Sequence, residues 1–404
     1  MPSGMQNTTN LSSSIRTKYA NKYIEAADYN RVYDRYAAPI GKEGVENQAF
    51  LANAVQVNFL SDMAIGTSTV SEAIDVVPQS LREAIATISP TSRWGALQWS
   101  ELIDLKAYTN YGEQRMRALG KNQAETVDLL AQAQALQGGF LHRAAARTSL
   151  DAGTAGHRLT DTVFSIIDAK LQSAKCPAYI DGNRSMYFAT MHPFVYHDIR
   201  LGGNIVSVAQ YQDKSIVLNF ELGQVGPFKL ISTPWAKVFW GGGAANGSAI
   251  ETTLAASATA NLALAKTIEV ASATNIDAGD QLLVGTHETG DTHYETNERV
   301  VVESISGTTI TIIGEGANGG LRFDHAIGEA VSNDDSVFPV VFGGPASIAK
   351  LYDSGVGEFG TIVGPKVDGI VDQFNTVGWK WYGNYGRWVE SWLIRGEFAS
   401  SLEA

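Results

Sequence analysis

The segment from Tyr111 to about Gln137, YGEQRMRALGKNQAETVDLLAQAQALQ, is the most regular part of the chain and sets the scale of the fold. Mostly apolar side chains recur along one stripe at three- and four-residue spacing: Met116, Leu119, Gln123, Val127, Leu130 and Gln134. Gly138-Gly139 follows and stops the pattern. The spacing predicts a helix of roughly 40 Å, at about 1.5 Å per residue, which is long for a globular protein.

Strands and turns are expected around this helix. The chain has 404 residues, of which 44% are hydrophobic and 40 are glycine. The length favours two or three structural units, and the apolar content allows a sizeable core. The glycine content indicates many turns and much β structure, so the predicted fold class is α+β.

The sequence before the long helix divides into three parts. Residues 1–13 are polar and predict a flexible arm, without the basic region and apolar core of a secretory signal. Residues 14–36 have helical spacing, and residues 37–105 mix polar stretches with short apolar pieces. The last part is typical of an extended excursion that leaves a domain and returns to it.

A second set of elements is predicted after the long helix. A helix is expected from about Thr160 to Ala174, with its inward side chains at Val163, Ile166, Ile167 and Leu171. A buried strand from Met186 to Met191 leads into a turn and a short helix. Strands follow around Gly226-Pro227 and from Trp235 to Trp240, where three glycines end the pattern.

Composition changes at that triple glycine. Residues 244–336 are first rich in Ala and Thr and then carry strand patterns in KTIEVAS, DQLLVGT, ERVVVESI and TTITII. Ser306-Gly307 lies between the last two and indicates a tight hairpin. The earlier style resumes at Val337, so 244–336 is predicted to be a small inserted β-domain.

The C-terminal segment concentrates aromatic side chains. It is expected to form two strands between Thr376 and Phe398 around a turn at 383–386, with the second strand apolar on both faces. Four of the eight tryptophans lie here, and with Arg395 they are the candidate residues of the segment: Trp379, Trp381, Trp388, Trp392 and Arg395. Such residues predict subunit core or subunit interface rather than a ligand platform.

Two motifs suggest cofactors, and neither fits its chemistry. Gly314, Gly316 and Gly319 have the spacing of a dinucleotide loop, but a turn and strand follow instead of the required helix. The stretch THETGDTHYETNE offers metal ligands at His287, Glu288, Asp291, His293 and Glu295. Their spacing matches no standard site, so a solvated loop is favoured, and neither cofactor nor metal is predicted.

The remaining candidates for catalysis are histidines and one cysteine. His197-Asp198 could serve a catalytic triad, but no G-x-S-x-G elbow is present. His192, before Pro193, and His325, beside Gly328, are expected to be turn residues. Cys176 is predicted to be a packed thiol. No catalytic residue is predicted.

Charge and cysteine content exclude several classes of protein. The formal net charge is −12 and the cations are scattered, which argues against tight sequence-independent DNA binding. A single cysteine excludes an intrachain disulfide and fits a reducing compartment. No apolar run is long enough for a membrane span.

Three segments carry a resemblance to a known family. The segment TVGWKWYGNYGRWVESWLIRGEF resembles the closing segment of major capsid proteins of coliphage N-four-like (schitovirus-type) phages. The matching positions there are Thr376, Val377, Gly378, Trp379, Lys380, Trp392, Leu393 and Arg395. YFATMHPFVYHDIRL is similar to a second family segment through Tyr187, His192, Pro193, Asp198 and Arg200. VVFGGPASIAKL resembles a third, and the likeness covers about 105–240 and 337–404.

The resemblance implies the Hong Kong 97 (HK97) type of capsid fold. Its parts would be an N-terminal arm at 1–40, an extended loop at 41–105, and a peripheral domain with the spine helix at 106–155 and 370–404. The axial domain would occupy 156–243 and 337–369, with the β-domain inserted at 244–336. The aromatic C-terminal strands would then pack beneath the spine helix.

The function implied is that of a major capsid protein, not an enzyme. Copies would assemble as hexamers and pentamers into an icosahedral shell around double-stranded DNA, without sequence-specific binding or a membrane. Scaffold, portal and decoration proteins are possible partners; assembly in the host cytoplasm would yield the virion. The alternative is a β-rich virion module that uses 244–336 to bind a receptor or glycan, and an enzyme ranks third.

Overall fold

The computed structural model describes most of the chain: residues 23–24, 31–39, 55–60, 83–100, 111–138, 140–181, 184–202, 206–207, 221–242, 250–259, 266–285, 296–314, 319–345, 347–352, 360–368 and 374–403. The predicted arm at 1–13 and the candidate metal ligands at 287–295 lie outside these residues. The chain divides into two compact units. The first comprises Met1–Ala131 and Ile348–Trp388, and the second comprises Gln132–Ser347 and Val389–Ala404.

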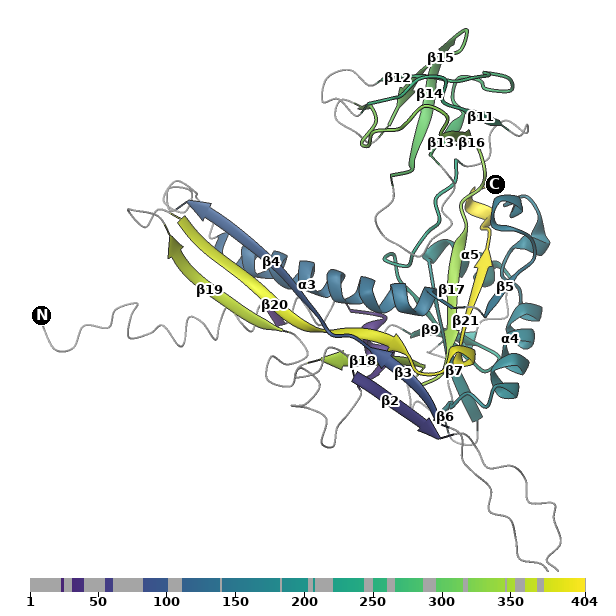
Figure 1. Cartoon of the computed structure of the whole chain (residues 1–404). Helices are drawn as coiled ribbons and strands as arrows, with labels where there is room; N and C mark the ends of the chain where they lie inside the picture. The colour runs from purple at the N-terminus through teal and green to yellow at the C-terminus, as the bar shows by residue number, and fades with distance from the viewer. Residues whose placement is uncertain are drawn as a thin grey trace, which may run out of the picture. The chain divides into compact units, whose positions relative to one another are not determined.

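A five-stranded sheet organises the first unit (Figure 1). Its order is β1 (Ala37–Pro39), β18 (Ile348–Tyr352), β20 (Phe374–Arg387) and β19 (Thr361–Asp368), and β4 (Thr91–Ser100) also pairs with β20. Burial alternates along β20, so Val377, Trp379, Trp381 and Tyr385 share the covered face. Successive side chains of a strand point to opposite faces, which explains this pattern.

The predicted long helix is confirmed as α3 (Tyr111–Leu136). Met116, Leu119, Gln123 and Val127 are buried as expected. In the last two turns Leu130 and Gln134 are only half-buried. The small Ala131 and Ala135 are buried instead, because the covered stripe widens there to take in neighbouring positions.

The predicted excursion contains an antiparallel pair, β2 (Val55–Leu60) with β3 (Glu83–Ile88), before β4 returns to the sheet. The helix expected up to Tyr36 is wrong at its end. Residues 31–33 are not helical, and Asp34–Tyr36 form only a 3₁₀ turn before β1. The Asp128 carboxylate accepts the backbone N–H groups of Val32 and Asp34, which replaces the bonds a helix would make there.

An eight-stranded mixed sheet forms the centre of the second unit. Its order is β5 (Leu141–Arg143), β21 (Leu393–Phe398), β17 (Phe338–Gly343), β7 (Arg184–Met191), β10 (Phe228–Ser232), β9 (Glu221–Val225) and β8 (Val206–Ser207), with β6 (Tyr179–Asp181) against β7. Helices α4 (Asp161–Ser173) and α5 (Pro193–Leu201) supply side chains to its core. The strand at Met186–Met191, the helix after it and the hairpin around Gly226-Pro227 are therefore confirmed.

Short 3₁₀ turns complete this unit at Arg147–Ser149, Ala155–His157, Glu390–Trp392 and Ser401–Glu403. Two predictions here are wrong. Ile166 of α4 is 40% exposed, whereas Phe164, between the expected positions, is buried. Residues 235–240 are not a strand, because Pro234 begins a turn in which Ala236 N–H bonds to the Thr233 carbonyl at 3.2 Å. Only Phe239 makes an isolated bridge, to Val337.

The expected turn at 383–386 is also wrong. Strand β20 continues through these residues, where Leu351 pairs with Asn384 and Lys350 with Tyr385. A Cβ on Gly383 would lie 2.3 Å from the Leu351 carbonyl oxygen, so glycine there permits close strand approach rather than a turn. Trp392 belongs to a 3₁₀ turn instead of a strand, and Trp388 and Trp392 are half-buried.

Residues 250–332 form a separate six-stranded antiparallel sheet. Its order is β11 (Glu251–Thr253), β16 (Ala330–Ser332), β13 (Gln281–Val284), β14 (Glu298–Ser306), β15 (Thr309–Ile313) and β12 (Thr267–Glu269). The four predicted strands are present, around an aliphatic core of their own. The hairpin turn is at Gly307-Thr308, one residue later than expected, with Gly307 at φ +66°.

Candidate functional site

Trp379 lies in the core of the first unit. It is 2% exposed, and its indole Nε1 donates to Asn122 Oδ1 of α3 at 3.2 Å. Gly95 of β4 pairs with Trp379, and a Cβ there would lie 2.7 Å from the indole nitrogen. Arg115 of α3 also stacks over the Trp99 ring of β4, 4.3 Å from its centroid. Aromatic side chains thus attach α3 to β4 and β20. Figure 1 shows these two strands running beside α3.

Trp381 packs against a buried polar cluster. Its ring is fully buried and stacks on Tyr385 with centroids 5.9 Å apart, and the Tyr385 hydroxyl donates to Asp34. Asp34 also pairs with Lys350 Nζ at 2.6 Å and with Arg31 at 3.0 Å. We call the ionic cluster the set Arg31, Asp34, Gln123, Asp128, Lys350 and Tyr385. It joins the N-terminal segment, α3, β18 and β20 within the first unit.

Titration within the ionic cluster is strongly perturbed. Burial would raise the pKa of Asp34, but Lys350 and Arg31 outweigh it and hold that pKa below its ordinary value. Asp128 lacks such cations, and burial raises its pKa to about 7 despite backbone N–H donors from 32–34. Gln123 accepts from Arg31 at 2.8 Å. The cluster therefore changes its charge at Asp128 near neutral pH.

Arg395 and Trp392 bind backbone and side-chain groups within the second unit. Arg395 Nη1 donates to the Leu136 carbonyl at the end of α3 at 2.6 Å, which satisfies a free helix-end acceptor. Its Nε lies 3.2 Å from Glu397, a fully buried carboxylate that also pairs with Arg147. Trp392 Nε1 donates to the Ala174 carbonyl at 3.2 Å. Both side chains have structural contacts inside the subunit, and their predicted role at a subunit interface stays a prediction.

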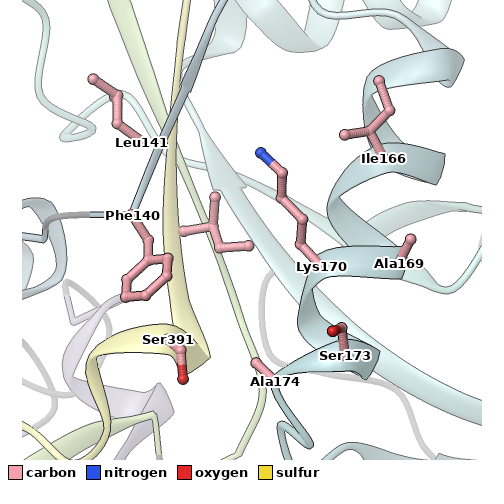
Figure 2. A pocket seen from close by; sticks show the side chains of 9 residues that line it. Phe140, Leu141, Ile166, Ala169, Lys170, Ser173, Ala174 and Ser391 are labelled. Carbon is pink, nitrogen blue, oxygen red and sulfur yellow. The ribbon is translucent and has the colours of Figure 1, made fainter.

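A groove opens beside Trp392 in the second unit. We call it the α4 groove; its volume is about 680 Å³ and it is lined by Phe140, Leu141, Ile166, Ala169, Lys170, Ser173, Ala174, Ser391 and Ile394. Figure 2 shows the Lys170 side chain extending from α4 into the space between that helix and Leu141. The groove has an apolar lining and a single cation, and sequence analysis did not detect it.

The histidine candidates form no nucleophile–base arrangement. His192 caps α5 and accepts from Phe194 N–H at 3.3 Å, as expected of a turn residue. Burial lowers its pKa to about 4, which keeps the ring neutral and able to accept. Asp198 accepts from the backbone and hydroxyl of Ser401, so the hydroxyl bonds to the carboxylate rather than to His197.

Cys176 is confirmed as a packed thiol. Burial raises its pKa to about 11. The thiol packs closely against Gly344, since a Cβ on that glycine would lie only 2.9 Å from the sulfur.

Gly314 and Gly319 are joined by a 2.8 Å backbone bond, and the chain then turns toward β16. Over the residues described here, no group of His, Cys, Asp and Glu is arranged to hold a metal ion. None of the described helices is long and apolar enough to span a membrane.

His325 is not the simple turn residue that the sequence suggested. The ring is buried, with Nδ1 2.7 Å from Glu329 and Nε2 3.0 Å from Glu298. Burial would lower its pKa, but the two carboxylates outweigh it and raise the pKa above the ordinary value. This triad attaches the start of β14 to the turn before β16. The i, i+4 spacing of His325 and Glu329 was the available signal, but Glu298 is distant in sequence.

The chain enters and leaves the six-stranded sheet at adjacent points. Phe239 and Val337 exchange two backbone bonds of 2.9 Å, and Gly241 N–H donates to Ser336 Oγ at 3.1 Å. Arg299 of β14 donates to the Gly241 carbonyl at 2.9 Å and pairs with Glu403 at 2.5 Å. The two connecting segments therefore form one neck, which Arg299 attaches to the C-terminal turn.

Solved structures share this architecture. The capsid of Ralstonia phage GP4 matches with a TM-score of 0.54 and 11% identity, over 91% of this chain and 88% of that chain. The capsid of cyanophage P-SCSP1u matches with a TM-score of 0.51 and 10% identity, over 92% of this chain and 89% of that chain. This chain has a phage capsid fold. No family model and no curated protein sequence matches it.

Because the matches span nearly the whole chain, the shared fold includes α3 and the sheets of both units. At such low identity the likeness concerns fold and not individual residues. The tryptophans and the ionic cluster therefore derive their interpretation from the contacts of this chain alone.

Proposed function

We propose that this chain is the major capsid protein of a tailed phage and has a structural role, not an enzymatic one. The observation that carries the proposal is the fold match to two phage capsids over more than nine-tenths of the chain. Copies of the chain would form hexamers and pentamers of an icosahedral shell around double-stranded DNA. The virion would be its final location, after assembly in the host cytoplasm.

The parts of the HK97-type fold are proposed as the sequence suggests, with support from local geometry. Residues 1–40 would be the arm and 41–105 the extended loop, which fits the β2–β3 pair. The spine helix and β20 would belong to the peripheral domain, and 156–243 with 337–369 to the axial domain. The sequence also assigns 393–398 to the peripheral domain, although β21 pairs with β17 in the sheet of the second unit.

We propose that 244–336 is an inserted β-domain. The neck at Phe239 and Val337, where the chain leaves and re-enters at adjacent points, supports this proposal. The separate core of the six-stranded sheet supports it as well. A decoration protein, a host surface or a neighbouring subunit would be its partner; scaffold and portal proteins would act during assembly.

Membership of the N-four-like subfamily is proposed from the residue motifs. Several matching positions have a clear structural role in this chain. Trp379 anchors α3, His192 caps α5, and Arg395 caps the end of α3. These structural roles give a physical reason for the motif residues, but the same roles would be needed in any capsid fold with this packing.

Sedimentation and negative-stain imaging of the purified chain test the proposed function. The chain is expected to form hollow shells or capsomer rings, alone or with a co-expressed scaffold. A protein that remains a small discrete oligomer under all assembly conditions would favour the receptor- or glycan-binding alternative.

A further inference from the structure

Helix α4 has apolar residues on two of its faces. Phe164, Ile167 and Leu171 are buried in the core of the second unit. On the other side Ile166 is 40% exposed, and Ala169 and Ser173 continue the same face one and two turns later. Phe140, 47% exposed, stands across the α4 groove. A helix that serves only its own core would present polar side chains on this outer face.

The single cation of the α4 groove has no internal counter-ion. Among the described residues, no carboxylate lies within ion-pair distance of Lys170, and its neighbour is instead His142. Burial and the nearby Lys170 ammonium both lower the pKa of His142. The chain as a whole has 42 acidic and 30 basic residues. The groove therefore matches an occupant that brings an apolar side chain together with a carboxylate.

The chain itself offers both components. Ile180 of β6 and Leu222 of β9 are exposed apolar side chains, at 71% and 43%. Carboxylates outnumber basic groups by 42 to 30 over the chain. In a shell, every subunit is surrounded by further copies at high local concentration, so a second copy is the occupant that these charges favour.

We propose, on the basis of the proposed function, that the α4 groove is a contact between subunits of the shell. An apolar side chain of a second copy enters between Phe140 and Ile166, and a carboxylate beside it pairs with Lys170. The ion pair orients the neighbour, and the apolar contact supplies most of the burial energy. The alternative occupants are a small apolar ligand and a separate protein.

Assembly of three variants gives the first test. Ile166→Asp places an unpaired charge in the contact and Lys170→Glu reverses the cation, so each should lower the yield of shells by about tenfold or more. Ile327→Asp is the control, because Ile327 is 65% exposed in the turn before β16, away from the α4 groove. The control should assemble within about twofold of the original chain. Normal assembly of both groove variants would overturn the proposal.

Zero-length cross-linking gives a second test that needs no mutation. Equal amounts of ¹⁵N-labelled and unlabelled chain are assembled together and treated with a carbodiimide, which joins an amine directly to a carboxylate. Lys170 should be linked to an acidic peptide of the opposite isotope label. Links only within one chain, or to another protein, would overturn the proposal while shells still form. A chain that stays monomeric and unlinked would overturn the proposed function as well.

Discussion

Asp128 illustrates how much one buried residue can contribute to the pH dependence of the first unit. Its pKa is raised to about 7 in the folded protein, chiefly by burial, whereas an unfolded aspartate titrates near 4. As pH rises, the unfolded chain therefore loses this proton at a lower pH than the folded protein does. The free energy of unfolding should fall by roughly 3 kcal/mol between pH 4 and pH 7 from this group, and then remain level.

Asp128→Asn keeps a side-chain oxygen for Val32 and Asp34 N–H but cannot ionise. Urea unfolding between pH 4 and pH 8 should show a weaker loss of stability across this window than in the original chain. Glu303→Gln, at an exposed position, is the control and should leave the pH profile unchanged. An unchanged profile in Asp128→Asn would mean that the carboxylate is already ionised at pH 5.

His325 adds a pH dependence of the same direction, in a higher pH window. Its pKa is raised by Glu298 and Glu329, so the charged imidazole stabilises the six-stranded sheet fully below about pH 6.5. This contribution is lost as pH rises through the folded pKa. Hydrogen exchange, corrected for intrinsic rates, should show residues 319–330 losing protection at alkaline pH. In His325→Gln, residues 319–330 should lack this protection at every pH. Equal protection of these residues in both proteins would exclude the triad as the cause of the pH dependence.

At the scale of elements, strand β20 shows what local sequence can and cannot reveal. Alternation of Trp379, Trp381 and Tyr385 predicts a half-buried strand, and that is what the chain forms. Gly383 and Gly386 suggested a turn, because glycine favours turns in the absence of other information. The actual reason for Gly383 is the Leu351 carbonyl on the neighbouring strand, which no local pattern encodes.

Gly383→Ala therefore has a definite expected effect. A Cβ would lie 2.3 Å from the Leu351 oxygen and 2.6 Å from the Trp381 ring, so strands β18 and β20 would have to separate. The free energy of unfolding should fall by about 2 kcal/mol or more, comparable to overpacking of a core. Asn384→Ala, at the next residue, removes the 2.8 Å hydrogen bond to the Ser89 carbonyl and the 2.9 Å bond that Oδ1 accepts from Tyr385 N–H, and should cost about 1 kcal/mol. If residues 383–386 formed a turn instead, Gly383→Ala would cost less free energy of unfolding than Asn384→Ala, since small residues are tolerated in turns.

At the scale of the whole molecule, the sequence predicted the elements better than their partners. Helix α3, the strands from β12 to β15 and the strand before His192 all follow from periodicity and turn residues. The pairing of β21 with β17 and β5 could not be predicted, because it joins segments far apart in the chain. The ionic cluster was missed for the same reason: Arg31, Asp128 and Lys350 have no local signature.

The proposed insertion of the β-domain provides a prediction at this scale. Replacing Ala245–Asp335 by a short Gly/Ser linker should leave a soluble subunit, because the Gly241 N–H already donates to Ser336 Oγ at 3.1 Å. Shells should still form, with lower thermal stability, since the Arg299 pair with Glu403 is lost. Electron microscopy and thermal unfolding of particles measure both effects. Outright aggregation of the deleted chain would mean that the six-stranded sheet is part of the shell wall.

The central claim is that copies of this chain build a closed shell. The most direct test is a cryo-electron microscopy reconstruction of particles made from the purified chain. The account predicts icosahedral particles in which the sheets of both units and the spine helix fit the density of every subunit in hexamers and pentamers. Particles without icosahedral symmetry, or small rings that never close, would contradict it.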